Sequence, residues 1–233
     1  MYSCIPVWVT KALALARPYF ESNQRLGYQC QPVIQDVYLG AGYSDAECLE
    51  AIQANGLSVI GDGPGIERKA AGLIATGKIV ARCAGRMEYG PRALGNRSIL
   101  YQATDRSVNT WLNERLRRTE FMPFAPVVLW EERDRCFKNV DGAGEAARFM
   151  TITFDCHAEL MEKCPAICHV DGTARPQLIR EEDNPSYYRL VKEYQSMTGL
   201  PCMVNTSFNM HEEPIVNTPM RPSNPFCKVA SMP

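Results

Sequence analysis

Long hydrophobic runs are missing from this sequence. No stretch of the 233 residues approaches the ~20 consecutive apolar residues that a membrane-spanning helix needs, so we expect no transmembrane segment. A secretory signal is also missing, because Lys11 and Arg17 interrupt the apolar residues near the amino end. The formal net charge of −1 argues against a nucleic-acid partner. We therefore expect a cytoplasmic globular protein.

Familiar catalytic and metal frameworks are missing as well. The ten cysteines follow no repeating pattern, so we expect reduced thiols instead of disulfides. Cys164, Cys168 and His169 have half of the ligand spacing of a zinc site, but no second half follows, and we expect no bound metal there. Residues 72–79 resemble a phosphate-binding loop, yet Ile79 replaces its magnesium-binding hydroxyl. No serine or cysteine stands in the context of a catalytic nucleophile.

Positive charge, by contrast, is concentrated in one region. Between residues 82 and 118 the chain has eight arginines, no lysine and three acidic residues, a local charge of +5 that the remainder balances with −6. Arginine without lysine favours planar, bidentate binding of phosphate or carboxylate. A solvated basic face is the alternative, and charge alone does not decide between the two.

The apolar pattern predicts an α/β domain in which a twisted, mostly mixed sheet is flanked by helices. Helices are expected at residues 44–56, 66–74, 108–118 and 184–199. Strands are expected at residues 57–60, 78–83, 124–130, 149–155, 166–170 and 201–204, with a mobile loop at residues 141–147. In the second helix, the expected buried face consists of Ile66, Ala70, Leu73 and Ile74.

The stretch "GRMEYGPRALGNRS", residues 85–98, is the strongest candidate site. Glycines on either side of Pro91 and Arg92 let backbone amides approach an anion, and the arginines add forked donors. The residues of this stretch that we expect to bind phosphate or nucleotide are Arg86, Gly90, Arg92, Asn96, Arg97 and Ser98. A structural turn with surface arginines is the alternative.

Two later motifs add polar candidates for substrate binding. His169, Asp171 and Arg175 could orient a substrate or hold a hydrated magnesium ion, although a lone histidine is more often structural. Asn205 opens "NTSFN", whose donors could bind an anion or a nucleotide, with an Asx-rich turn as the alternative. Because loops at strand ends converge in open α/β sheets, we expect these motifs and the arginine-rich stretch to share one pocket.

Taken in order, the motifs resemble those of the carboxy-terminal domain of the NodU/CmcH carbamoyltransferases, which carbamoylate hydroxyl groups of nodulation factors, aminoglycosides and cephem antibiotics. The resemblance runs from residue 36 to residue 219 and rests on "GRMEYGPRALGNRSIL", "RTEFMPFAP", "HVDGTARPQ", "NPSYYRL" and "TGLPCMVNTSFNMHEEPIVNTP". It implies a YrdC-like fold for residues 31–219, an amino-terminal extension at residues 1–30 and an atypical tail at residues 220–233.

The resemblance also implies a chemistry. In this family the domain forms carbamoyl adenylate from carbamoyl phosphate and ATP with Mg²⁺, and a separate amino-terminal domain transfers the carbamoyl group. YrdC-like folds use a basic pair and a Ser-x-Asn element at the nucleotide and carbonyl substrate. The first matches Arg117 and Arg118 and the second matches Ser207 and Asn209, which are the expected catalytic residues. Arginine forks would offset the repulsion between the two anionic substrates.

The chain departs from the family pattern in three respects. Met122 replaces an arginine of the usual "FRPFAP", Glu212 stands where a glycine often precedes "EPIV", and none of the residues resembles the transfer domain. We therefore expect half of a two-domain enzyme that needs a partner domain or chain, with an altered closing segment that could favour homodimers. Two alternatives stay open: a nucleotide-binding or anion-binding module without turnover, and an RNA-binding protein.

Overall fold

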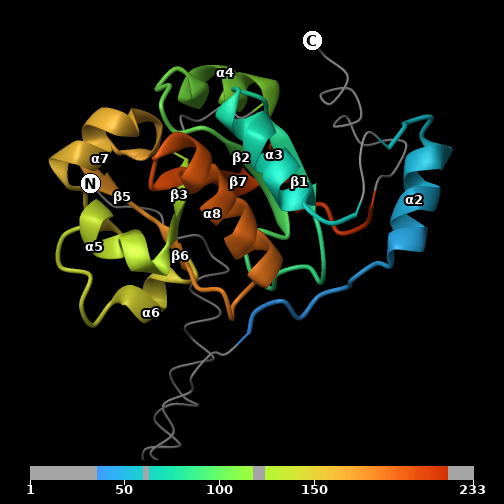
Figure 1. The fold of residues 1–233 in the computed structure, drawn as a ribbon, viewed down its shortest axis with the longest axis horizontal. Coiled ribbons are helices and arrows are strands. Elements are labelled where there is room, and N and C mark those ends of the chain that lie inside the picture. Colours follow the sequence, from blue (N-terminus) through green and yellow to red (C-terminus); the bar gives the residue numbers. More distant parts are fainter. Residues whose placement is uncertain (1–35, 60–62, 118–123, 220–233) are drawn as a thin grey trace, which may run out of the picture. The chain divides into compact units, whose positions relative to one another are not determined.

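A computed structural model describes residues 36–59, 63–117 and 124–219 of the chain, coloured in Figure 1. These residues form a mixed α/β unit around a five-stranded sheet of order β1-β2-β7-β3-β6. In that order the strands are Val80–Cys83, Arg97–Tyr101, Cys202–Ser207, Ala125–Leu129 and Gln177–Ile179. Neighbouring strands are antiparallel except β3 and β6, which are parallel. The mixed sheet with flanking helices is the predicted fold class.

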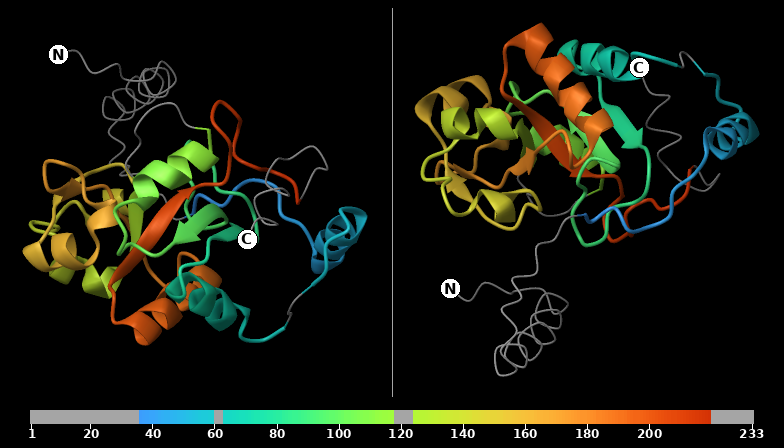
Figure 2. Two further views of the ribbon diagram at one scale, coloured as in Figure 1. Left: turned by 90° about the horizontal axis from the view of Figure 1, so that it is seen from above. Right: turned by 60° about the horizontal axis from the view of Figure 1, so that its bottom comes forward.

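Helices cover both faces of this sheet. Helices α3 (Ile66–Ala75) and α8 (Pro185–Thr198) pack on one face, and α4 (Val108–Arg115) packs on the other, as Figure 2 shows. Side chains alternate between the faces along each strand. Leu100 and Met203 therefore join the cluster under α3 and α8, whereas Ile99 and Val204 join the cluster under α4.

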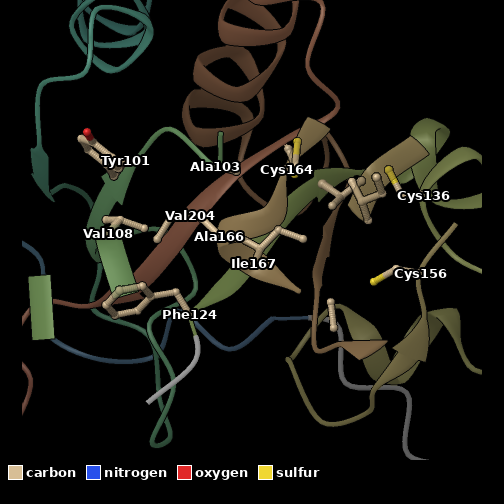
Figure 3. Packing of buried hydrophobic residues seen from close by; sticks show 14 of the residues in the cluster. Tyr101, Ala103, Val108, Phe124, Cys136, Cys156, Cys164, Ala166, Ile167 and Val204 are labelled. Atoms are coloured by element: carbon tan, nitrogen blue, oxygen red, sulfur yellow. The ribbon is translucent and has the colours of Figure 1, made fainter. Parts of the chain in front are cut away.

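The cluster under α4 continues into a subdomain of short elements, part of which Figure 3 shows. A second, two-stranded sheet lies here, formed by β4 (Phe154–Asp155) and β5 (Thr173–Ala174). The helical segments of this subdomain are Trp130–Glu132, α5 (Arg133–Cys136), α6 (Gly144–Ala147), α7 (Ala158–Lys163) and Pro165–Ile167. No helix in the described part of the chain is both long enough and apolar enough to cross a bilayer.

The predicted helix ends are confirmed where capping residues mark them. Asn184 accepts a hydrogen bond from the Tyr187 N–H at 3.2 Å, Pro185 occupies the first turn of α8, and Gly199 ends the helix with φ 70°. Ser44 forms a capping box with Glu47 at the start of α2 (Asp45–Ala54). Capping needs only neighbouring residues, so the sequence alone is sufficient to locate it.

Several predictions that rested on short apolar runs are wrong. Residues 57–59 form no strand, 166–170 begin in a 3₁₀ turn, and 149–155 contribute only β4. The loop predicted at 141–147 from its glycine and alanine content includes a short helix, α6, at Gly144–Ala147. Runs this short cannot show whether they follow a strand or a helix period.

The predicted buried face of α3 is confirmed for Ile74, which is fully buried, and for Ala70, which packs against the core. It is wrong for Ile66 and Leu73, which are 46% and 52% exposed, whereas Ala71 is fully buried. Small Ala71 allows the close approach of α8 that excludes the larger side chains from this contact. Residues 1–30, 220–233 and Arg118 lie outside the described residues.

Two glycines of the arginine-rich loop allow a matched test of its packing. Gly90 and Gly95 both have φ 114°, but a Cβ on Gly90 would meet nothing within 4 Å, whereas one on Gly95 would lie 2.2 Å from Cδ1 of Tyr187. We expect Gly90→Ala to lower the free energy of unfolding by about 1–2 kcal/mol through backbone strain, and Gly95→Ala by roughly 2 kcal/mol more. Urea denaturation of both variants checks this, and equal losses would contradict the packing of Tyr187 against Gly95.

Candidate anion-binding site

The separate polar motifs meet at one edge of the main sheet. In the observed register Cys83 pairs with Arg97, Ser98 with Ser207, and Asn205 with Ala125. The ends of β1 and β7 therefore lie beside the starts of β2, β3 and β6. This topology confirms that the arginine-rich stretch, "DGTAR" and "NTSFN" converge, although strand starts contribute to the edge as well as strand ends.

Glu88 organises the loop between β1 and β2. Its side chain is 2% exposed, and its Oε1 accepts hydrogen bonds from the backbone N–H groups of Leu94 at 2.6 Å, Asn96 at 3.1 Å and Arg97 at 3.1 Å. Carboxylate oxygens form stronger hydrogen bonds than neutral acceptors. Sequence analysis used Glu88 only in the charge count and missed its role in the loop. A single acidic residue in a glycine-rich segment, where many backbone amides need acceptors, is the signal that could have indicated this role.

Two predicted phosphate ligands, Arg97 and Asn96, instead hold this loop together. Arg97 is fully buried, and its guanidinium donates to the carbonyls of Ala84 at 2.8 Å and Asn96 at 3.0 Å. The Asn96 side chain donates to the carbonyl of Arg86 at 2.8 Å and accepts from Asn184 at 2.8 Å. Inward-facing backbone carbonyls need such donors. We therefore do not retain Asn96 and Arg97 among the ligand contacts.

Ser98, Arg86 and Gly90 have different surroundings. Ser98 is buried and accepts the N–H of Gly95 at 3.0 Å, so it too supports the loop. Arg86 is exposed and donates to the carbonyls of Leu39 at 3.0 Å and Gly40 at 3.2 Å. Gly90 is exposed at the tip of the loop. Of these three, only Arg86 and Gly90 present accessible groups.

Arg92 and Arg175 form the electrostatic centre of the site. Both side chains are half-buried, and neither has an ion pair or a hydrogen bond with any described residue. Burial and the charge of Arg92 lower the pKa of Arg175 to about 10, and burial lowers the pKa of Arg92 as well. Two desolvated cations that repel each other are unfavourable until an anion lies between them. This pair therefore marks a candidate anion site.

His169 and Asp171 adjoin Arg175. Thr173 donates its hydroxyl hydrogen to Asp171 at 2.8 Å, so its contact of 2.9 Å with Nδ1 of His169 requires an N–H on that nitrogen. Burial lowers the pKa of His169, the charge of Asp171 raises it, and the charge of Arg175 lowers it further. The imidazole is therefore neutral near pH 7 and keeps Nε2 as an acceptor.

Asn205 lies beneath the arginine-rich loop. It is 1% exposed, and its Nδ2 donates to the carbonyl of Ala93 at 3.1 Å and to Oε1 of Gln177 at 2.9 Å. Gln177 in turn donates to the carbonyl of Leu94 at 2.8 Å. Asn205 thus contacts the backbone next to Arg92, and Gln177 is a site residue that sequence reasoning missed because nothing in the pattern separates it from an ordinary strand glutamine.

Three of the four predicted catalytic residues, Arg117, Ser207 and Asn209, lie in segments that border the same edge. Ser207 is half-buried at the end of β7, and Asn209 donates from Nδ2 to the carbonyls of Met210 at 3.0 Å and Glu213 at 2.8 Å. Arg117 is exposed with φ 55° after α4. The preceding Leu116 accepts the N–H of His211 at 3.0 Å, which joins the end of α4 to the turn after β7. Arg118 lies outside the described residues.

The described residues do not fit a metal ion held by the protein alone. Within residues 36–59, 63–117 and 124–219, no three His, Cys, Asp or Glu side chains gather as a set of ligands. Asp171 contributes one exposed carboxylate near His169. Magnesium bound through substrate phosphates needs only one or two protein carboxylates, which is the arrangement that these residues could support.

Comparison with known proteins identifies the family. The family model "Carbamoyltransferase C-terminus" matches residues 71–230, more than half of the chain. The chain belongs to this carbamoyltransferase family. The matched region contains the loop organised by Glu88, the Arg92–Arg175 pair and the turn after β7, so the family assignment covers the whole candidate site.

Several relatives support this assignment over most of the chain. MJ1058 of Methanocaldococcus jannaschii is 47% identical over 151 residues, which is 64% of this chain and 24% of that protein. Nodulation protein NolO of Bradyrhizobium diazoefficiens is 36% identical over 188 residues, which is 79% of this chain and 34% of that protein. Nodulation protein U of Rhizobium tropici is 33% identical over 180 residues, which is 77% of this chain and 29% of that protein. The chain thus spans about a quarter to a third of the length of these relatives.

Two solved structures resemble part of the chain. HypF of T. kodakarensis gives a TM-score of 0.45 at 24% identity and covers 68% of this chain and 18% of its own. Full-length HypF in a phosphate- and nucleotide-bound form gives a TM-score of 0.46 at 21% identity, and the match covers 68% of this chain and 19% of that one.

The role of Glu88 can be tested with an isosteric change. Glu88→Gln keeps the size of the side chain but removes the charge that strengthens three hydrogen bonds, and we expect it to lower the free energy of unfolding by about 2–3 kcal/mol. Glu162, exposed on α7, is the matched control, and Glu162→Gln should change stability by no more than about 0.5 kcal/mol. Urea denaturation that gives the same small change for both variants would show that Glu88 does not organise the loop.

Proposed function

We propose that this domain binds carbamoyl phosphate and ATP and forms carbamoyl adenylate. The observation that carries the proposal is the Arg92–Arg175 pair, two half-buried cations without an acidic partner among the described residues. Membership of the carbamoyltransferase family supports carbamoyl chemistry at this edge of the sheet. Both substrates are polyanions, and paired arginines suit phosphate better than lysines do because the planar guanidinium offers two parallel donors.

The arginine pair would act mainly by positioning its anion. With a pKa of about 10, Arg175 stays protonated near neutral pH, so the site is charged before the ligand arrives. Preorganised donors in a partly desolvated site stabilise developing negative charge without rearranging at the moment of reaction. Arg86 and Gly90, exposed on the same loop, would contact the remaining phosphates. Arg117, Ser207 and Asn209 would bind the nucleotide, and the same role is proposed for Arg118, which lies outside the described residues.

Formation of carbamoyl adenylate would take two steps, each of which breaks one bond and forms another. In the first, water hydrolyses carbamoyl phosphate to carbamate and inorganic phosphate. In the second, a carbamate oxygen attacks the α-phosphorus of ATP and pyrophosphate leaves. Neutral His169 would accept a hydrogen bond at Nε2 from the carbamoyl NH₂ group, since Thr173 already occupies Nδ1. A magnesium ion carried by ATP would neutralise phosphate charge, with Asp171 as its protein ligand. Transfer to an acceptor would be carried out by the part of the longer relatives that this chain does not cover.

Calorimetry with carbamoyl phosphate tests the proposal. We expect Arg92→Gln and Arg175→Gln each to weaken binding by about 10-fold to 100-fold, because each removes a charge-assisted hydrogen bond. Arg68, on α3 with its side chain 73% exposed, is the control, and Arg68→Gln should leave the affinity unchanged.

Pyrophosphate release with ATP and Mg²⁺ separates an enzyme from a binding module. Release that requires Arg92 and Arg175 is the expected result. Binding without release would leave only the anion-binding function, and a folded protein that does not bind carbamoyl phosphate would contradict the proposal.

A further inference from the structure

Two buried amides link the strands to the arginine-rich loop. Gln177 opens β6 and is 3% exposed, and Asn205 lies in β7 and is 1% exposed. Gln177 donates to the carbonyl of Leu94 and accepts from Asn205, which also donates to the carbonyl of Ala93. We call the Gln177 and Asn205 side chains the amide clasp. It holds two consecutive carbonyls of a loop that has no sheet partner of its own at these residues.

The amide clasp joins the two segments that carry the site's cations. Ala93 follows Arg92 directly, and Gln177 comes two residues after Arg175. The two guanidiniums repel each other, as the effect of Arg92 on the pKa of Arg175 indicates. Repulsion between partly desolvated charges pushes their segments apart. Hydrogen bonds from two buried amides oppose that movement, because breaking them would leave polar groups unpaired in the interior.

The fold of the loop itself depends on other contacts. Glu88 accepts the N–H of Leu94, and the hydroxyl of Tyr38 donates to the carbonyl of Leu94 at 2.8 Å. Neither contact involves the Gln177 side chain. Formation of the loop therefore does not depend on Gln177. Its hydrogen bonds instead fix the position of the loop relative to the start of β6, and so relative to Arg175.

We propose that Gln177, acting with Asn205, is a positioning residue that sets the separation of the Arg92 and Arg175 guanidiniums so that both bind one phosphate group. The choice of carbamoyl phosphate as the ligand rests on the proposed function. The positioning role itself rests on the geometry of the amide clasp. It assigns Asn205 to support of the arginines and not to direct contact with substrate.

A double-mutant cycle tests this positioning role. Carbamoyl phosphate affinity is measured for the unmodified chain, Gln177→Met, Arg92→Gln and the double variant. Gln177→Met keeps the approximate volume but removes the hydrogen bonds. We expect it to weaken binding by about 10-fold in the unmodified chain and by less than about 2-fold when Arg92 is already replaced, because coupled sites are not additive. Equal weakening in both backgrounds would overturn the inference.

A matched control separates positioning from general stability. Asn109, 5% exposed on α4, donates to the carbonyl of Ala166 at 2.8 Å, and Asn109→Leu removes a comparable buried hydrogen bond away from the arginines. It should lower thermal stability without changing the affinity for carbamoyl phosphate. An affinity loss equal to that of Gln177→Met would make the effect a general one and overturn the inference.

A ligand-free readout distinguishes failure of this inference from failure of the proposed function. The pKa of Arg175, measured by NMR titration of its guanidinium, should rise toward its ordinary value in Gln177→Met as Arg92 moves away. An unchanged pKa would overturn the positioning role even if carbamoyl phosphate binds. A raised pKa in a chain that binds no carbamoyl phosphate would support the amide clasp and reject the proposed ligand.

Discussion

The carboxylate of Glu88 is the interaction on which the candidate site depends. A loop of this length between β1 and β2 has many inward-facing amides and carbonyls, and one buried oxygen collects three of the amides. Arg97 then satisfies carbonyls of the same loop, so a negative and a positive side chain complete its interior. With these backbone groups paired, the loop can hold Arg92 at the edge of the sheet with no acidic partner among the described residues.

Under the proposed function, that arrangement gives up stability in return for anion binding. Arg92 and Arg175 would be more favourable as exposed residues or with acidic neighbours, and the lowered pKa of Arg175 reflects the cost of their positions. Functional sites commonly keep such unfavourable groups where the surrounding structure holds them. Here the surrounding structure is identifiable: Glu88 fixes the loop, and Gln177 and Asn205 attach it to β6 and β7. A bound phosphate would remove the repulsion and stabilise the folded chain in proportion to its occupancy.

Sequence reasoning identified the parts of the molecule that are encoded locally or by long motifs. The caps of α2 and α8, the mixed α/β class and the family follow from adjacent residues or from extended patterns. It failed for residues 166–170 and for the exposed face of α3, where tertiary packing decides. Within the site it could not separate Arg92 from Arg97, because both arginines share one glycine-rich context and only the fold shows that Arg97 faces the interior. Glu88 was missed since its partners are backbone amides, and Gln177 since its partners, the carbonyl of Leu94 and the side chain of Asn205, are distant in the sequence.

A crystal structure of this chain soaked with inorganic phosphate tests the candidate site most directly. We expect phosphate density within about 3 Å of both the Arg92 and the Arg175 guanidiniums, with Arg97 still bound to the carbonyls of its own loop. Phosphate bound at Arg86 or Arg97 alone, or saturating phosphate with the Arg92 and Arg175 side chains turned away from each other into solvent, would contradict this expectation.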